Sequence, residues 1–107
     1  ESLQPLMHFS SISQLNLSSN RIRKINEVLY FKNLTRLDIS SNLLVQVDGI
    51  EVFQNLEYLN LACNDVAEYS PLYNLSELKE LHVSETISDI QYNELVEKLP
   101  NARIRKE

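Results

Sequence analysis

Few side chains of this 107-residue sequence have the chemistry for catalysis or metal binding. The single cysteine is Cys63, and the two histidines are His8 and His82. A nucleophilic thiol needs a base placed against it, and no base for Cys63 can be identified in the sequence. Neither histidine has a second ligand at the short spacings that zinc sites use. We therefore expect no catalytic residue and no metal site, and we interpret Cys63 as a structural or partly exposed thiol.

Acidic side chains lie close together in the sequence at two places, Asp65 with Glu68 and Glu77 with Glu80. A catalytic pair of carboxylates needs a pocket around it, so we interpret both pairs as solvated surface positions. Gly49 is the single glycine, which excludes a glycine-rich loop for phosphate groups. The sequence therefore predicts a protein without enzymatic activity and without a cofactor.

The charge and hydropathy of the chain limit the classes of partner. A net charge of −5 argues against nucleic acid, which binds basic surfaces. We interpret the one basic cluster, Arg21 with Arg23 and Lys24, as a solvated loop, and a nucleic-acid patch is the alternative. No apolar run is long enough to cross a membrane, and no signal peptide is visible. The localisation stays open, with the cytoplasm favoured.

A nine-residue pattern recurs along the chain and must position these side chains. In residues 56–64 it reads L-x-x-L-x-L-x-x-N, and residues 12–20 and 34–42 match it. Residues 78–86 match except at the last position, where Thr86 replaces the asparagine. The four copies begin 22 residues apart, and self-similarity at such a period is typical of repeat architectures.

Each copy of the pattern predicts a short strand followed by a turn. Apolar and polar residues alternate within it, as in a strand with one buried face. After the asparagine, apolar residues recur every three positions, which suits 3-10 or extended turns. One unit cannot bury its leucines alone, so neighbouring units must stack into a parallel sheet with a continuous core behind it. The inward strand residues are expected to be Leu15, Leu17, Leu37, Ile39, Leu59, Leu61, Leu81 and Val83.

This pattern resembles the leucine-rich repeat family over nearly the whole chain. Ile22-x-x-Ile25 and Ser70-Pro71-Leu72-x-x-Leu75 are similar to its SDS22-like class of 22-residue repeats, which includes internalin-like proteins. The resemblance implies an α/β fold, a right-handed solenoid with a short parallel β-sheet on the concave face. The convex face would carry 3-10 or extended turns. It also implies a structural asparagine column whose side chains satisfy loop backbone groups, formed by Asn20, Asn42 and Asn64.

The repeats predict a single domain over residues 1–107. Residues 1–11 read as a partial repeat, residues 12–33, 34–55 and 56–77 as full repeats, and residues 78–107 as a terminal repeat. Ser88 and Gln91 have the spacing of a capping box. A helical cap is therefore expected at about residues 89–98, with Ile90, Leu95 and Val96 facing inward.

A last strand is expected after this helix. Leu99 restarts the motif 21 residues after Leu78. That spacing would place Asn101 beside Glu80, Arg103 beside His82 and Arg105 beside Ser84.

Leucine-rich repeat solenoids present an extended concave surface, so the resemblance implies a non-enzymatic module that binds a protein through this surface. Strand side chains alternate, so the residues between the inward leucines face outward. Tyrosine and arginine are enriched among interface hot spots, which makes Arg36 and Tyr58 the expected anchors. The alternative is that these side chains only satisfy one another across neighbouring strands. The expected protein-binding residues are Arg36, Asp38, Tyr58, Asn60, Glu80 and His82.

Two expectations concern the rest of the molecule to which the chain belongs. The first strand of the partial repeat is missing, so self-association or further repeats are expected at the uncapped N-terminal edge. The chain could also be an N-terminally truncated or regulatory segment of a larger protein, either a bacterial surface adhesin or an enzyme-associated regulatory domain. The partner protein is left unidentified, and neither nucleic acid nor a membrane is expected.

Overall fold

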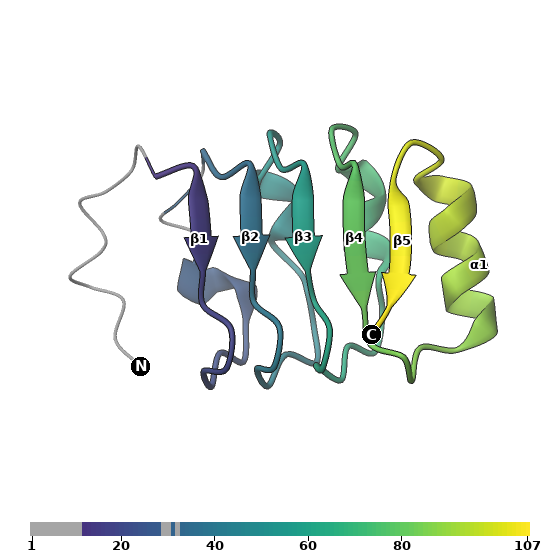
Figure 1. Cartoon of the computed structure of the whole chain (residues 1–107), viewed down its shortest axis with the longest axis horizontal. Coiled ribbons are helices and arrows are strands. Elements are labelled where there is room, and N and C mark those ends of the chain that lie inside the picture. The colour runs from purple at the N-terminus through teal and green to yellow at the C-terminus, as the bar shows by residue number, and fades with distance from the viewer. Residues whose placement is uncertain (1–11, 29–30, 32) are drawn as a thin grey trace.

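The computed structural model describes residues 12–28, 31 and 33–107. His8 and the expected partial repeat of residues 1–11 lie outside this part of the chain. Within it, five short strands form one parallel sheet in the order β1-β2-β3-β4-β5 (Figure 1). The strands are β1 (Gln14–Asn16), β2 (Arg36–Asp38), β3 (Tyr58–Asn60), β4 (Glu80–Val83) and β5 (Arg103–Lys106).

The connections between strands run behind the sheet. They carry the 3-10 segments η2 (Ile25–Val28), η3 (Ile50–Val52) and η4 (Ser70–Asn74). Each strand in Figure 1 points downward and the next lies to its right, with the connection behind, so the coil is right-handed. The expected leucine-rich repeat solenoid, with its parallel sheet, its 3-10 turns and its helical cap, is confirmed.

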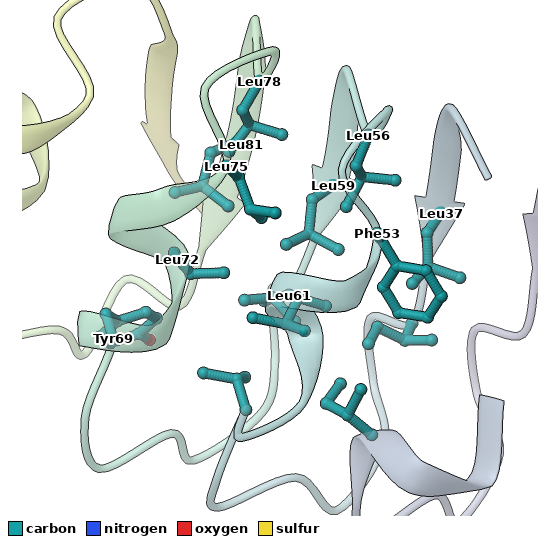
Figure 2. Close-up of a cluster of buried hydrophobic side chains, with 14 of the residues drawn as sticks. Leu37, Phe53, Leu56, Leu59, Leu61, Tyr69, Leu72, Leu75, Leu78 and Leu81 are labelled. Atoms are coloured by element: carbon teal, nitrogen blue, oxygen red, sulfur yellow. The ribbon is translucent and has the colours of Figure 1, made fainter. Parts of the chain in front are cut away.

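The core fills the space between the sheet and the turns. Figure 2 shows Leu37, Leu59 and Leu81 from the strands lying against Phe53 and Leu72 from the turn segments. These five side chains have no exposed surface. Fully burying a side chain of this size stabilises the fold by about 1.5–3 kcal/mol, so the repeated inward positions supply most of the driving force for stacking.

The first three strands, β1, β2 and β3, end in the same tight turn. Ser19, Ser41 and Cys63 occupy equivalent positions, 22 residues apart, and have φ angles of 61°, 56° and 58°. A left-handed conformation is uncommon for residues other than glycine, and here it redirects the chain from the sheet toward the back of the solenoid. The thiol of Cys63 is exposed at this turn.

The helix α1 (Asp89–Lys98) closes the stack beside β5 (Figure 1). The Ser88 side chain accepts a hydrogen bond from the Gln91 N–H at 3.1 Å, as an N-cap residue does. Leu95 is fully buried, but Ile90 and Val96 are 73% and 47% exposed, so their expected inward orientation was wrong. Only one side of a helix reaches the edge of a sheet, and at about 100° per residue Val96 lies well off the side that carries Leu95.

The register of the last strand also differs from the expectation. Glu80 pairs with Arg103, Leu81 with Ile104 and His82 with Arg105. Asn101 precedes the strand, so the repeat spacing at this point is 23 residues and not 21. The ten-residue helix replaces a 3-10 turn here, so the 22-residue period no longer sets where the next strand begins. In the described part of the chain, no helix has both the length and the apolar character needed to cross a membrane.

Candidate protein-binding face

The outward side chains of the five strands form two parallel rows across the sheet. We call this surface the sheet face. The first row consists of Gln14, Arg36, Tyr58, Glu80 and Arg103, and the second of Asn16, Asp38, Asn60, His82 and Arg105. All six residues expected to bind protein therefore lie on one surface, although their role in binding stays a prediction.

Arg36 and Tyr58 form a stacked pair in the first row. The guanidinium carbon of Arg36 lies 3.7 Å from the centre of the Tyr58 ring. The His82 ring also lies near Tyr58, with ring centres 5.3 Å apart and planes at 51°. Cation–π contacts of this kind contribute about 0.5–1 kcal/mol at exposed sites. An attraction of this size favours the stacked orientation of Arg36 and Tyr58 over other rotamers.

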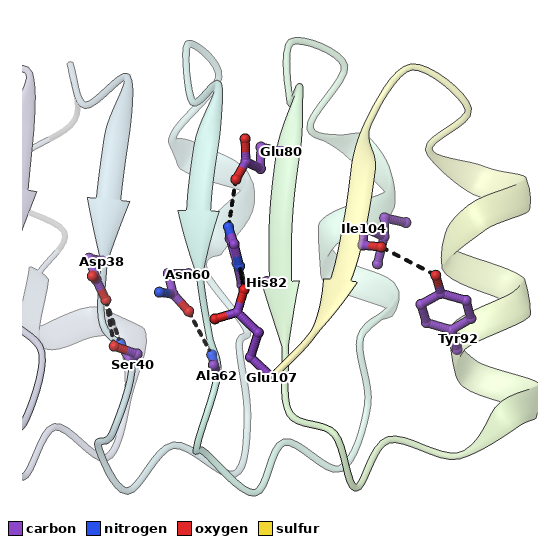
Figure 3. A network of polar contacts seen from close by, with 9 residues as sticks. All are labelled: Asp38, Ser40, Asn60, Ala62, Glu80, His82, Tyr92, Ile104 and Glu107. Atoms are coloured by element: carbon purple, nitrogen blue, oxygen red, sulfur yellow. Dashed lines mark hydrogen bonds and ion pairs between the residues drawn. The ribbon is translucent and has the colours of Figure 1, made fainter.

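His82 lies between two carboxylates, as Figure 3 shows. Its Nε2 is 2.6 Å from Glu80 Oε2, and its Nδ1 contacts a carboxylate oxygen of Glu107. The side chain of His82 points outward from the sheet, as expected. Its neighbours nevertheless cover it, so that His82 is only 8% exposed.

The charge of Glu80 is stabilised by its surroundings. The hydrogen bond with His82 lowers the pKa of Glu80 below its ordinary value, and the positive charges of Arg105 and Arg103 act in the same direction. Glu80, His82 and Glu107 thus form a network that ties β4 to the end of β5. Glu107 was not expected at this site, and Arg103 and Arg105 were expected beside His82 and Ser84, because the position of all three depends on the register of β5.

Asp38 and Asn60 have a structural role at the ends of their strands. Asp38 Oδ1 accepts hydrogen bonds from the Ser40 N–H at 3.0 Å and the Ser40 hydroxyl at 2.7 Å. Asn60 Oδ1 accepts one from the Ala62 N–H at 3.0 Å (Figure 3). These are turns in which a side-chain oxygen satisfies the backbone two residues later. The sequence contains a signal for these turns, since an Asn or Asp stands two residues before a small residue in three repeats.

The asparagine column lies just beyond these turns and connects successive repeats. Asn42 and Asn64 are each 7% exposed. Asn42 Oδ1 accepts from the Ile22 N–H at 2.9 Å, and Asn64 Oδ1 accepts from the Leu44 N–H at 3.0 Å. Their amide groups donate back to carbonyl oxygens at strand ends, such as Ile39 O, which receives both. Asn20 is half-buried, and its amide donates to Leu17 O at 2.9 Å.

Two shallow hollows flank the stacked pair on the sheet face. One, of about 390 Å³, is lined by Gln14, Leu15, Asn16, Arg36, Asp38 and Tyr58. The other, of about 280 Å³, is lined by Gln14, Thr35, Arg36, Glu57, Tyr58, Lys79 and Glu80. The described residues hold no group of three or more His, Cys, Asp or Glu side chains that could bind a metal ion. This surface offers charged and aromatic groups for contact, and we identify no set of residues on it for bond making.

Comparisons with known proteins agree with this geometry. A family model described as Leucine Rich repeat matches residues 54–67. The structure is similar to internalin C2 from Listeria monocytogenes, with 30% identity and a TM-score of 0.78. It is also similar to a leucine-rich repeat protein from Leptospira interrogans, with 26% identity and a TM-score of 0.80. The fold of the internalin InlF from Listeria monocytogenes is similar as well, with 22% identity and a TM-score of 0.77.

The chain is shorter than each of these solved structures. It matches over 92% of its own length to internalin C2, 92% to the Leptospira protein and 94% to InlF. It spans 43%, 26% and 30% of their respective lengths. No curated protein matches the chain.

Proposed function

Because the chain belongs to the leucine-rich repeat family, with an internalin-like structure, we propose that it binds a protein partner through its sheet face. The leucine-rich repeat fold generally mediates contacts between proteins. Its members are typically non-enzymatic, and we propose the same for this chain. The narrower SDS22-like assignment stays a prediction.

The observation that carries the proposal is the stack of Arg36 on Tyr58 at 3.7 Å. Arg36 is exposed and Tyr58 is half-buried, so both retain surface for a partner. Their mutual contact and the nearby His82 ring limit the rotamers they can adopt. Binding then costs less side-chain entropy than it would for two free long side chains, for which about 0.5–1.5 kcal/mol each is lost.

The arrangement of charges supports the same surface. Arg36 and Asp38 belong to β2, and both line one hollow beside Tyr58. On the other side of Tyr58, the network of Glu80, His82 and Glu107 is already internally paired. A partner can therefore gain charged hydrogen bonds at Arg36 and at the second oxygen of Asp38, while the His82 network contributes shape and orientation.

The experiment is affinity capture with the 107-residue chain as bait, followed by titration of the captured protein. Tyr58→Ala and Arg36→Ala are each expected to weaken binding by more than about 1 kcal/mol, as hot-spot substitutions do. Glu51→Gln is the matched control: it lies in η3 on the opposite side and keeps an acceptor for the Gly49 N–H that Glu51 binds at 2.9 Å. If the control weakens binding while both sheet-face variants stay within about 0.5 kcal/mol of the unmodified chain, the assignment of the face is wrong.

A second candidate is that the chain acts as one segment of a larger protein, such as a bacterial surface adhesin or an enzyme-associated regulatory domain. The greater lengths of the similar structures favour it, since the chain spans less than half of each. Capture with the intact natural protein separates the two readings. A partner that binds the longer protein but not the 107-residue chain supports the second one.

A further inference from the structure

The loops that follow β1, β2 and β3 are stacked against one another. The Leu43 N–H donates to Ile22 O at 2.9 Å, which joins the first loop to the second. The Asp65 N–H donates to Leu44 O at 3.0 Å, and the Ala67 N–H donates to Val45 O at 3.0 Å, which joins the second to the third. Residues 21–24, 43–46 and 65–68 therefore form three adjacent rows along the lower edge of the solenoid in Figure 1.

These rows differ in chemistry, and we call the surface they form the loop stripe. Buried Ile22, Leu44 and Val66 anchor the rows, and the remaining side chains are exposed. The first row is basic, the second apolar and the third acidic. In that order the rows present Arg21, Arg23 and Lys24, then Leu43, Val45 and Gln46, then Asp65, Ala67 and Glu68.

The apolar row presents two large exposed hydrophobic side chains. Leu43 and Val45 are 48% and 50% exposed and lie two residues apart on the same loop. A hollow of about 480 Å³ borders them on the basic side, where Arg23 and Lys24 line it. A second hollow of about 580 Å³ borders them on the other side, where Asp65 is among the lining residues. The core does not require these apolar side chains, because Leu44 between them already fills the inward position.

We propose that the loop stripe binds a second copy of this chain. A two-fold axis through the apolar row reverses the order of the rows, so each basic row faces an acidic row and the two apolar rows meet. This axis lies in the interface along the apolar row, so each residue keeps its place within its row, and Lys24 of one copy lies opposite Glu68 of the other. The interface is isologous, and the charge pairs occur twice.

The charge order favours a second copy over nucleic acid. Neighbouring parallel units lie about 4.8 Å apart, so the acidic row lies only about 10 Å from the basic row and would repel phosphate groups. The stripe has about nine side chains, fewer than the roughly 20–30 per partner of a standard interface, so the dimer is weak. The sheet face stays exposed in this dimer, and the inference is independent of the proposed function.

The test uses charge reversal in two separate variants, Lys24→Glu and Glu68→Lys, measured by sedimentation equilibrium of the full 107-residue chain. Alone, each variant places like charges opposite each other at two symmetric contacts, and we expect dimerisation to weaken at least about tenfold. Mixed together, the two variants pair opposite charges at both contacts and should form a heterodimer more readily than either forms a homodimer. Leu43→Ser should weaken dimerisation without changing any charge.

The controls alter net charge by the same amounts at exposed positions of α1. Lys98→Glu matches Lys24→Glu, and Glu97→Lys matches Glu68→Lys; both controls are expected to dimerise as the unmodified chain does. Circular dichroism checks that every variant is folded. A chain that stays monomeric up to about 1 mM overturns the proposal. The proposal is also overturned if neither charge reversal changes the dimer dissociation constant. It is overturned too if the mixture of the two variants dimerises no better than each variant alone.

Discussion

Asn42 Oδ1 accepts a hydrogen bond at 2.9 Å from the backbone N–H of Ile22, a residue of the preceding repeat. The same Asn42 side chain donates to Leu17 O and Ile39 O, both at 3.0 Å. One buried amide thus joins two repeats through backbone groups that the sheet leaves unpaired. The column is a continuous connection along the solenoid as well as a feature of each repeat.

Replacing Asn42 with alanine is therefore expected to destabilise the chain by about 2–3 kcal/mol, because buried backbone groups lose their partners. Urea denaturation followed by circular dichroism measures the change. Asn20→Ala is the control, since Asn20 is half-buried and water can replace its hydrogen bonds. If Asn42→Ala and Asn20→Ala lowered the free energy of unfolding equally, burial of the asparagine would not explain the destabilisation.

The network around His82 predicts a dependence of stability on acid. The pKa of Glu80 is lowered in the folded chain, first by the hydrogen bond with His82. The unfolded chain therefore binds more protons between this lowered pKa and the ordinary value, and the stabilisation is present above the ordinary value and lost as the pH falls.

The effect is measured by comparing unfolding free energies of the unmodified chain and Glu80→Gln from about pH 6 to pH 3. The unmodified chain should be more stable than Glu80→Gln at pH 6, and this difference in unfolding free energy should shrink as the pH drops below about 4.5. The loss should be less than about 1 kcal/mol, because Glu80 is partly exposed. Glu97→Gln, at an exposed position of α1, should show no such difference. A constant difference across the whole range would exclude the proposed linkage.

The buried Tyr69 is expected to make the folded chain less stable at alkaline pH. Burial raises the pKa of Tyr69 above 10.0, and the nearby charge of Asp65 adds to the shift. Above the ordinary pKa the unfolded chain releases a proton that the folded chain retains, so stability is present below about pH 10 and falls as the pH rises further. Tyr69→Phe should remove part of this alkaline loss in denaturant titrations at pH 9 to 11. If Tyr92→Phe has the same effect, burial of Tyr69 is not the cause.

The helical cap depends on Ser88. Ser88→Ala removes the acceptor for the Gln91 N–H and is expected to destabilise α1 by about 1 kcal/mol. Hydrogen exchange should quicken in the first turn of the helix more than in β2 or β3. Ser76→Ala, at an exposed position before β4, is the control. Unchanged exchange in the first turn would show that the helix does not depend on this cap.

The sequence by itself determined the register of the first four strands. A period of 22 residues assigns every leucine of the pattern to the same side, so Leu37, Leu59 and Leu81 must be buried together once the units stack. The same period places Arg36 beside Tyr58 and Asp38 beside Asn60, which is the register found in the sheet. The asparagine positions follow equally, because a polar side chain repeated at a buried site needs hydrogen-bond partners.

Only the tertiary structure decided what happens where the period ends. The helix α1 separates β4 from β5 by a segment without the repeat pattern, so the sequence could not place Arg103 beside Glu80. That register brings Glu107 to His82, which changes an expected exposed histidine into a covered one. The orientation of α1 leaves Ile90 exposed, because only one side of the helix can contact the end of the stack. Periodicity fixes a contact only between units that repeat, and contacts across a break depend on how the whole chain packs.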